Sequence, residues 1–238
     1  MPDFTICVAR KTLRIHSLYD RARTLCRDYL VPPETPADYC LSVTPAEIAA
    51  ERSAPDTAGY SDGYLETLAL YRKLCSVLSA DRIFMMHGAV VAVGDAAYMF
   101  TAPSGTGKTT HIRLWLEQIP GSYVVNGDKP LLLVPEEGDV LVCGTPWCGK
   151  EGLNTNTVVP LRAVVLLRRG TTNEIAEVSA GEHFVPLLAQ IHRPAEQEAA
   201  IRVQSLLPEF MNRVRVCQMF CTPEPQAALT ARRFLQSL

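Results

Sequence analysis

Residues 89–110, AVVAVGDAAYMFTAPSGTGKTT, decide the fold of this chain. Two β-type runs, 89–93 and 96–101, flank Gly94-Asp95, a pair typical of a tight hairpin turn. An apolar strand therefore leads directly into a glycine-rich loop, and the spacing of apolar residues predicts an amphipathic helix over 109–119. A strand, a loop and a helix in this order form the context that a phosphate-binding loop requires.

The loop itself, residues 102–109, reads A-P-S-G-T-G-K-T and matches the Walker A pattern except that Ala102 replaces the first glycine. Glycines let the backbone turn its N–H groups towards phosphate oxygens. Lys108 can reach the β and γ phosphates as a point charge, and the Thr109 hydroxyl can bind Mg²⁺. We therefore expect a nucleoside triphosphate with Mg²⁺ to bind here. The expected nucleotide-binding residues are Ser104, Gly105, Thr106, Gly107, Lys108, Thr109 and Thr110.

Hairpins on both sides of the loop predict a mixed sheet. In an ordinary doubly wound fold, the strand that bears such a loop has parallel neighbours reached through crossovers. Here a hairpin joins that strand to its predecessor, and two further runs form a second hairpin around residues 135–138. The remaining elements expected in this part are strands at 123–125, 131–134, 140–143, 161–167 and 214–220, and helices at 182–191, at 195–207 and after Pro223.

The first 80 residues predict a separate, small α/β lobe. Its expected elements are strands at 4–8, 12–15 and 39–43, and helices at 19–29, after Thr44 and at 64–78. Thr44, Pro45 and Glu47 form a capping signature, with Pro at the first helical position. The chain is therefore expected to divide into a lobe at 1–80 and a nucleotide-binding domain at 81–238.

Composition excludes several classes of partner. The chain has 238 residues, of which 47% are hydrophobic and 20% are charged, the balance of a soluble globular protein. A net charge of −2 gives no field for nucleic acid or an anionic membrane. No apolar run approaches the ~18 residues that cross a bilayer, and a charge soon follows the first apolar residues. We expect a cytoplasmic protein whose eight cysteines, without a C-x-x-C pair, are free thiols.

Three motifs together resemble the HPr kinase/phosphorylase and phosphoenolpyruvate carboxykinase group. They are M-H-G-A-V-V-A-V-G-D at 86–95, the glycine-rich loop, and V-N-G-D-K-P at 125–130, with a looser match in G-T-P-W-C-G-K-E-G-L at 144–153. The similarity covers residues 83–170 and hardly touches the first 80. It implies the mixed-sheet P-loop core of that group, with the small N-terminal α/β lobe added. Carboxykinase activity is not expected, because those enzymes are about twice as long and use extra arginines around manganese.

The resemblance also implies roles for individual residues. Asp128 matches the second acid of the family's Asp-Asp pair and would hold Mg²⁺. Gly127 replaces the first acid, which the family uses to activate the attacking hydroxyl. His87 matches a histidine beside the phosphates, although a histidine bonded at the start of a strand explains it as well. The proton acceptor is thus left open between Asp128, Glu151 and His87.

Residues 144–156 contain three glycines, one proline and a polar end, which predicts an irregular loop near Asp128. In it, Lys150 could neutralise charge on the transferred phosphoryl group, and Glu151 could accept the proton. Trp147 either offers a face to an acceptor or anchors its own loop. The alternative for Lys150 and Glu151 is that they belong to a mobile, solvated connection without a catalytic role.

Two functions follow from these expectations. The first is an ATP- and Mg²⁺-dependent kinase acting on a hydroxyl of a small metabolite or a peptide, with Lys108, Asp128, His87, Lys150 and Glu151 as catalytic candidates. Phosphoryl transfer depends mainly on positioning and charge, so the missing acid does not exclude it. The second is a non-catalytic nucleotide-binding module that recognises a partner through its lobe, which Gly127 favours.

Overall fold

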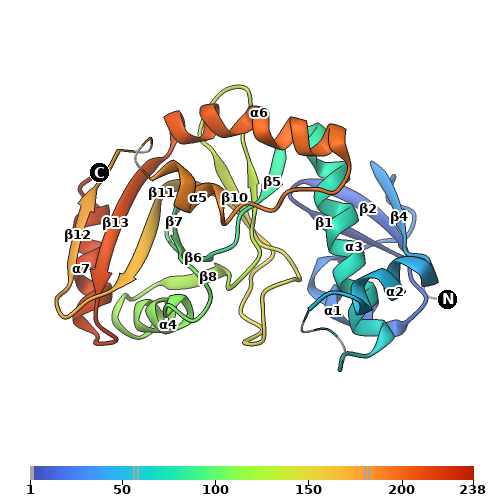
Figure 1. Cartoon of the computed structure of the whole chain (residues 1–238), viewed down its shortest axis with the longest axis horizontal. Helices are drawn as coiled ribbons and strands as arrows, with labels where there is room; N and C mark the ends of the chain where they lie inside the picture. The colour runs from blue at the N-terminus through green and yellow to red at the C-terminus, as the bar shows by residue number, and fades with distance from the viewer. Residues whose placement is uncertain (1–2, 56, 58, 180, 182) are drawn as a thin grey trace.

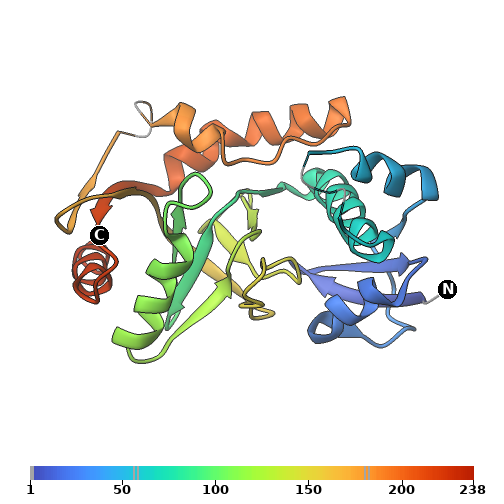
Figure 2. The ribbon, with the colours of Figure 1, turned by 60° about the horizontal axis from the view of Figure 1, so that its bottom comes forward.

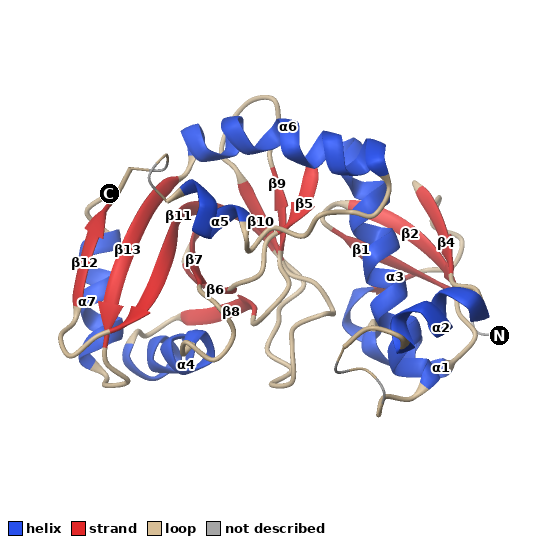
Figure 3. Cartoon of the chain, in the orientation of Figure 1, coloured by secondary structure: helices blue, strands red, loops and turns tan. Residues whose placement is uncertain are grey.

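The computed structural model describes residues 3–55, 57, 59–179, 181 and 183–238. The chain forms a mixed α/β structure with two sheets (Figures 1 and 3). The N-terminal sheet has four strands in the order β3-β1-β2-β4, and the larger sheet has nine. The blue N-terminal part and the C-terminal strands lie at opposite ends of the molecule in two views (Figures 1 and 2).

The N-terminal part is close to its prediction. Its strands are β1 (Asp3–Val8), β2 (Lys11–His16), β3 (Leu30–Val31) and β4 (Tyr39–Ser42). Its helices are α1 (Asp20–Leu25), α2 (Pro45–Arg52) and α3 (Asp62–Leu78), with short 3-10 turns at Arg27–Tyr29 and Ser79–Asp81. Thr44 and Glu47 form the expected capping box at the start of α2. The helix expected over 19–29 is wrong at its end, because the chain changes to a 3-10 turn after Leu25.

The larger sheet contains the strands expected after residue 80 and two that were not. Its strands are β5 (Ile83–Met85), β6 (Ala89–Val93), β7 (Ala96–Thr101), β8 (Ser122–Asn126), β9 (Leu131–Leu133), β10 (Leu141–Cys143), β11 (Val158–Arg169), β12 (Glu174–Glu177) and β13 (Arg215–Cys221). The expectations missed β5 and β12. The helices are α4 (Lys108–Gln118), α5 (Phe184–Leu188), α6 (Gln197–Arg213) and α7 (Gln226–Leu235). The helix expected over 182–191 is shorter, and its first residue lies outside the described residues.

The mixed character of the sheet is confirmed. β6 and β7 form an antiparallel hairpin around Gly94, whose φ of 62° is in the left-handed region. On its other side β7 pairs in parallel with β11, and β11 pairs in parallel with β13. The β9–β10 hairpin is also antiparallel, as expected. The strand that precedes the glycine-rich loop therefore has one antiparallel and one parallel neighbour.

Helices cover both faces of this sheet because its central strands are apolar on both sides. Alternate residues of β6 enter different cores, with Val90 in one and Val91 in the other. The first core packs against α6, through Leu206 and Phe210. The second packs against α4 and α7, with Trp115 fully buried. The glycine-rich loop thus joins a central strand to a helix that is fixed by its own packing.

Helix α6 extends from the larger sheet towards α3, over the top of the molecule in Figures 1 and 2. The two parts also share apolar packing, since the N-terminal core includes Leu131, Cys143 and Trp147 from the larger sheet and its loops. All eight cysteines are free, as expected. Within the described ranges, no helix is long and apolar enough to cross a bilayer.

Candidate functional site

The glycine-rich loop turns between β7 and α4. Gly105 and Gly107 have φ values of 77° and 120°, which side-chain-bearing residues rarely adopt, and Gly107 caps the helix. Ala102 is buried and is not among the residues with positive φ. Alanine therefore fits the position of the first Walker A glycine without backbone strain.

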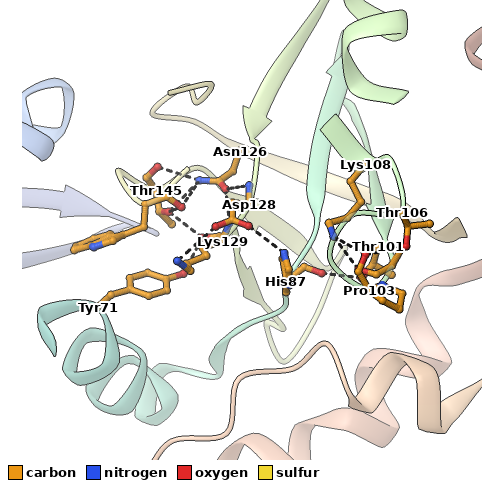
Figure 4. Close-up of polar contacts among 12 residues, drawn as sticks. Tyr71, His87, Thr101, Pro103, Thr106, Lys108, Asn126, Asp128, Lys129 and Thr145 are labelled. Atoms are coloured by element: carbon orange, nitrogen blue, oxygen red, sulfur yellow. Dashed lines mark hydrogen bonds and ion pairs between the residues drawn. The ribbon is translucent and has the colours of Figure 1, made fainter. Parts of the chain in front are cut away.

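The side chain of Lys108 folds back onto the start of the glycine-rich loop. Its Nζ donates to the carbonyl oxygens of Ala102 at 2.8 Å and Pro103 at 3.4 Å (Figure 4). The residue is only 8% exposed. Burial lowers the pKa of the Lys108 ammonium below its usual value, although the charge of Asp128 acts in the opposite direction. A buried cation held only by carbonyl oxygens is well suited to gain an anionic ligand.

Asp128 lies in a turn that the buried side chain of Asn126 organises. The Asn126 Oδ1 accepts from the backbone N–H groups of Asp128 at 2.9 Å and Lys129 at 2.7 Å. Its Nδ2 donates to the Thr145 carbonyl and hydroxyl, both at 3.0 Å. Tyr71 of α3 and Thr145 both donate to the Lys129 carbonyl, at 2.7 and 2.9 Å (Figure 4). The carboxylate of Asp128 is therefore presented by a rigid turn.

None of the site residues expected from the sequence was Asn126, Thr145 or Tyr71. An asparagine followed by glycine often bonds the backbone two or three residues ahead, so the N-G-D motif carried a usable signal for Asn126. Thr145 and Tyr71 act through contacts between residues far apart in the chain, which no local pattern reveals.

His87 and Asp128 form a pair. The His87 Nε2 lies 3.0 Å from the Asp128 Oδ1, and the Gly88 N–H donates to the Asp128 carbonyl at 3.1 Å. The hydroxyl of Thr101, at the end of β7, donates to the His87 carbonyl at 2.7 Å (Figure 4). Burial would raise the pKa of Asp128, yet the hydrogen bond with His87 and the charge of Lys129 bring that pKa below its usual value. Asp128 is therefore ionised at neutral pH.

A cleft of about 750 Å³ separates the N-terminal part from the larger sheet. We call it the lobe cleft. It brings together five of the predicted site residues, which are Ser104, Thr109, Asp128, Lys150 and Glu151. The opposite wall comes from the N-terminal part, and its residues are Arg21, Leu25, Tyr64, Thr67 and Leu68.

Other predicted nucleotide-binding residues face elsewhere. Gly105, Thr106, Gly107 and Thr110 line a different pocket. Successive hydroxyls at the start of α4 thus reach different spaces, Thr109 the lobe cleft and Thr110 the second pocket. Lys108, the residue before these two threonines, is buried and lines neither space.

The expected irregular loop, residues 144–156, contains no helix and no strand. It is the yellow loop that descends beside α4 in Figure 1. The Trp147 Nε1 donates to the Thr67 carbonyl at 2.8 Å, and its ring packs on Tyr71 with centroids 4.7 Å apart. Trp147 therefore anchors its own loop to α3. Glu151 pairs with Arg113 of α4, whereas Lys150 is exposed and has no polar partner in the described part of the chain.

Gly127 is fixed by this loop. A Cβ atom at position 127 would lie 2.9 Å from the Cys148 carbonyl oxygen and 3.4 Å from that of Leu153. The Gly127 N–H also donates to the Leu153 carbonyl at 3.0 Å. The space that a side chain would need is thus occupied by the backbone of residues 148–153. An acid cannot stand here without moving the loop.

Oxygen donors suit this site for Mg²⁺, a hard cation that usually takes one or two carboxylates together with phosphate oxygens. The Thr109 hydroxyl lines the same cleft as the ionised Asp128 and makes no hydrogen bond within the described ranges. The described residues contain no group of three or more histidine, cysteine or acidic side chains that could hold a metal ion. Thr109 and Asp128, which line one cleft, are the residues that could hold Mg²⁺ here.

Comparisons with known proteins give little for this chain. No family model matches it, and no curated protein matches its sequence. Among solved structures, the HPr(Ser) kinase/phosphatase from Coxiella burnetii is similar over 65% of this chain and 99% of its own length. The identity is 8% and the TM-score is 0.36, too low to carry an argument. The functional assignment therefore rests on the site.

Proposed function

We propose that this chain is an ATP- and Mg²⁺-dependent kinase that transfers the γ-phosphate to a hydroxyl of a small metabolite or a peptide. The observation that carries the proposal is the lobe cleft, where the glycine-rich loop meets an ionised carboxylate held in a rigid turn. Ser104 and Thr109 come from the loop and the start of α4, and Asp128 comes from the turn after β8. Phosphoryl transfer needs such a convergence of phosphate binding and metal binding.

Phosphate binding would draw Lys108 away from the carbonyl oxygens of Ala102 and Pro103. A polyanion stabilises the charged ammonium, which burial now disfavours. The Thr109 hydroxyl and Asp128 would hold Mg²⁺, and the ion, when bound, would reduce the negative charge on the phosphates. Lys150, exposed in the loop that lines the cleft, would neutralise charge that develops on the transferred group.

We assign the proton acceptor to His87. Its Nε2–H donates to Asp128, which leaves the Nδ1 lone pair available, and Nδ1 makes no hydrogen bond in the described part of the chain. In the reaction the acceptor oxygen forms a bond to the γ-phosphorus while the bond from that phosphorus to the bridging oxygen breaks. ADP leaves, and the hydroxyl proton passes to His87. Glu151 is less suited to this role, because its carboxylate is paired with Arg113.

The N-terminal part would help to select the acceptor. It forms the wall of the lobe cleft that faces Asp128, and the Arg21 guanidinium is held 5.2 Å above the ring of Tyr64. Hydrogen bonds from Tyr71 and to Thr67 tie this wall to the Asp128 turn and to the loop at 144–156. An acceptor in the cleft would therefore contact both parts of the chain.

A non-catalytic nucleotide-binding module is the second candidate, and Gly127 favours it, since the loop at 148–153 closes that position against an acid. The deciding experiment incubates the chain with ATP, Mg²⁺ and a panel of hydroxyl-bearing metabolites and peptides, and measures mass gain of one phosphate. We expect an acceptor-dependent gain that the His87→Gln variant reduces by ~10² or more. ATP binding without a gain on any acceptor, and without ATP hydrolysis, would favour the second candidate.

A further inference from the structure

A second pocket opens at the glycine-rich loop and shares no lining residue with the lobe cleft. Its volume is about 440 Å³, within the range of sites that hold small ligands. We call it the α4 pocket. Its walls are the loop at 105–107, three residues of α4, residues 169–170 at the end of β11, and residues 221–223 at the end of β13.

The two pockets meet the loop at neighbouring residues. Thr109 lines the lobe cleft with Asp128, whereas Thr110 lines the α4 pocket with Gly107. A triphosphate whose terminal phosphate lies near Asp128 and Thr109 reaches the α4 pocket by directing its other end past Thr110. From this geometry we infer that the nucleoside half of the phosphoryl donor binds in the α4 pocket. The inference rests on the proposed function, which places the reacting phosphate in the lobe cleft.

The chemistry of the α4 pocket fits a neutral base and sugar attached to phosphates. No acidic residue is among the described residues that line it, while the lobe cleft contains Asp128 and Glu151. Leu114 and Pro223 supply apolar surface, and the Arg169 guanidinium donates to the Gly105 carbonyl at 2.6 Å. A cation fixed at the glycine-rich loop favours the phosphate end of a ligand, and apolar walls favour its flat base.

His111 adds an unpartnered polar atom at this wall. Its Nε2 accepts a hydrogen bond from the Trp115 Nε1 at 3.1 Å, so the proton of the neutral ring belongs on Nδ1. That Nδ1 is buried and has no partner among the described residues. A buried donor without an acceptor is costly, and a nucleoside brings oxygen and nitrogen acceptors to the wall that this ring forms.

The test compares Mg²⁺-ATP with Mg²⁺-tripolyphosphate, which lacks a nucleoside, by calorimetry on the full chain. The variants are Leu114→Trp, which fills the α4 pocket, and Leu116→Trp, whose residue is 41% exposed on the same helix outside that pocket. We expect Leu114→Trp to weaken ATP at least about tenfold and tripolyphosphate less than about twofold. Leu116→Trp should change neither. Equal affinities of ATP and tripolyphosphate for the wild type would overturn the inference and leave the phosphate site intact.

A second measurement does not depend on a variant that folds. Photolabelling of the wild type with 8-azidoadenosine triphosphate should modify residues within 105–114, 169–170 or 221–223, which contain the lining of the α4 pocket. Label confined to residues 3–81 would place the base at the lobe cleft. That result would refute the inference and leave the proposed function standing. If neither ATP nor tripolyphosphate binds in the calorimetric experiment, the proposed function fails, and the inference fails with it.

Discussion

Gly127 gives the sharpest structural prediction, because its neighbours are backbone atoms that cannot rotate away. In the Gly127→Ala variant the new Cβ would lie 2.9 Å from the Cys148 carbonyl oxygen, a distance that real Cβ atoms essentially never show. The strand end cannot simply move, since the Gly127 N–H is bonded to Leu153 and the next N–H to Asn126. Inserting a carbon into such packing costs about 1–3 kcal/mol.

The assay is thermal unfolding, with Gly59→Ala as the matched control. A Cβ at Gly59 meets nothing within 4 Å, and its φ is not in the left-handed region. For a chain of this length, a loss of about 1–3 kcal/mol lowers the melting temperature by roughly 2–12 °C. Gly59→Ala should stay within about 0.5 kcal/mol of the wild type. A Gly127→Ala variant that melts with the wild type would refute the close packing of the loop over this position.

The same packing predicts that Gly127→Asp creates no working base. A carboxylate at 127 would displace the loop that carries Lys150 and Glu151. Turnover should fall together with stability. A rise in turnover without loss of stability would show that the position is open.

Four further predictions concern charge. Asp128→Asn keeps the size of the side chain but removes the carboxylate offered to Mg²⁺, so turnover should collapse while calorimetry shows nearly unchanged binding of metal-free ATP. Activity of this variant at ordinary Mg²⁺ concentrations would contradict the role of Asp128 in holding the metal. Arg113→Gln and Glu151→Gln should lower turnover by the same factor, below about tenfold, because both break one exposed ion pair. A loss of ~10² or more for Glu151→Gln alone would identify Glu151 as the proton acceptor. Lys150→Ala should lower turnover at saturating acceptor while ATP affinity is unchanged. Burial lowers the pKa of His111 from 6.5 to about 4, so between these pH values the unfolded chain binds a proton at His111 and the folded chain does not. The free energy of unfolding should therefore fall by roughly 3 kcal/mol as the pH drops from 6.5 to 4. Urea titrations in which His111→Gln keeps the full pH dependence would contradict this.

Local sequence patterns were sufficient for the central elements. The hairpin at residues 89–101 and the capping box at Thr44 depend on neighbouring residues, and both are found where they were expected. The missed strands β3, β5 and β12 have two, three and four residues, too few to show a period. Their pairing partners, β1, β9 and β13, are distant in the chain.

The candidate site was predictable only where a single residue in a sequence motif identifies a role. Asp128 could be identified from its motif, and it lines the same cleft as Thr109. The pairing of His87 with Asp128 and the contact of Glu151 with Arg113 arise from the tertiary fold. The absence of an acid at Gly127 was visible in the sequence. Its physical reason, the carbonyl of Cys148, was not, because that oxygen arrives from a loop twenty residues later.

The most direct test of the central claim is calorimetry of Mg²⁺-ATP binding to the wild type and to Lys108→Ala. Removing the ammonium deletes a charge-assisted contact to phosphate worth about 1.5–3 kcal/mol. Lys73→Ala is the control, since that lysine pairs with Glu47 in the N-terminal part. We expect ATP affinity to fall at least about tenfold in Lys108→Ala and to stay unchanged in Lys73→Ala. Unchanged affinity in a folded Lys108→Ala variant would contradict nucleotide binding at the glycine-rich loop.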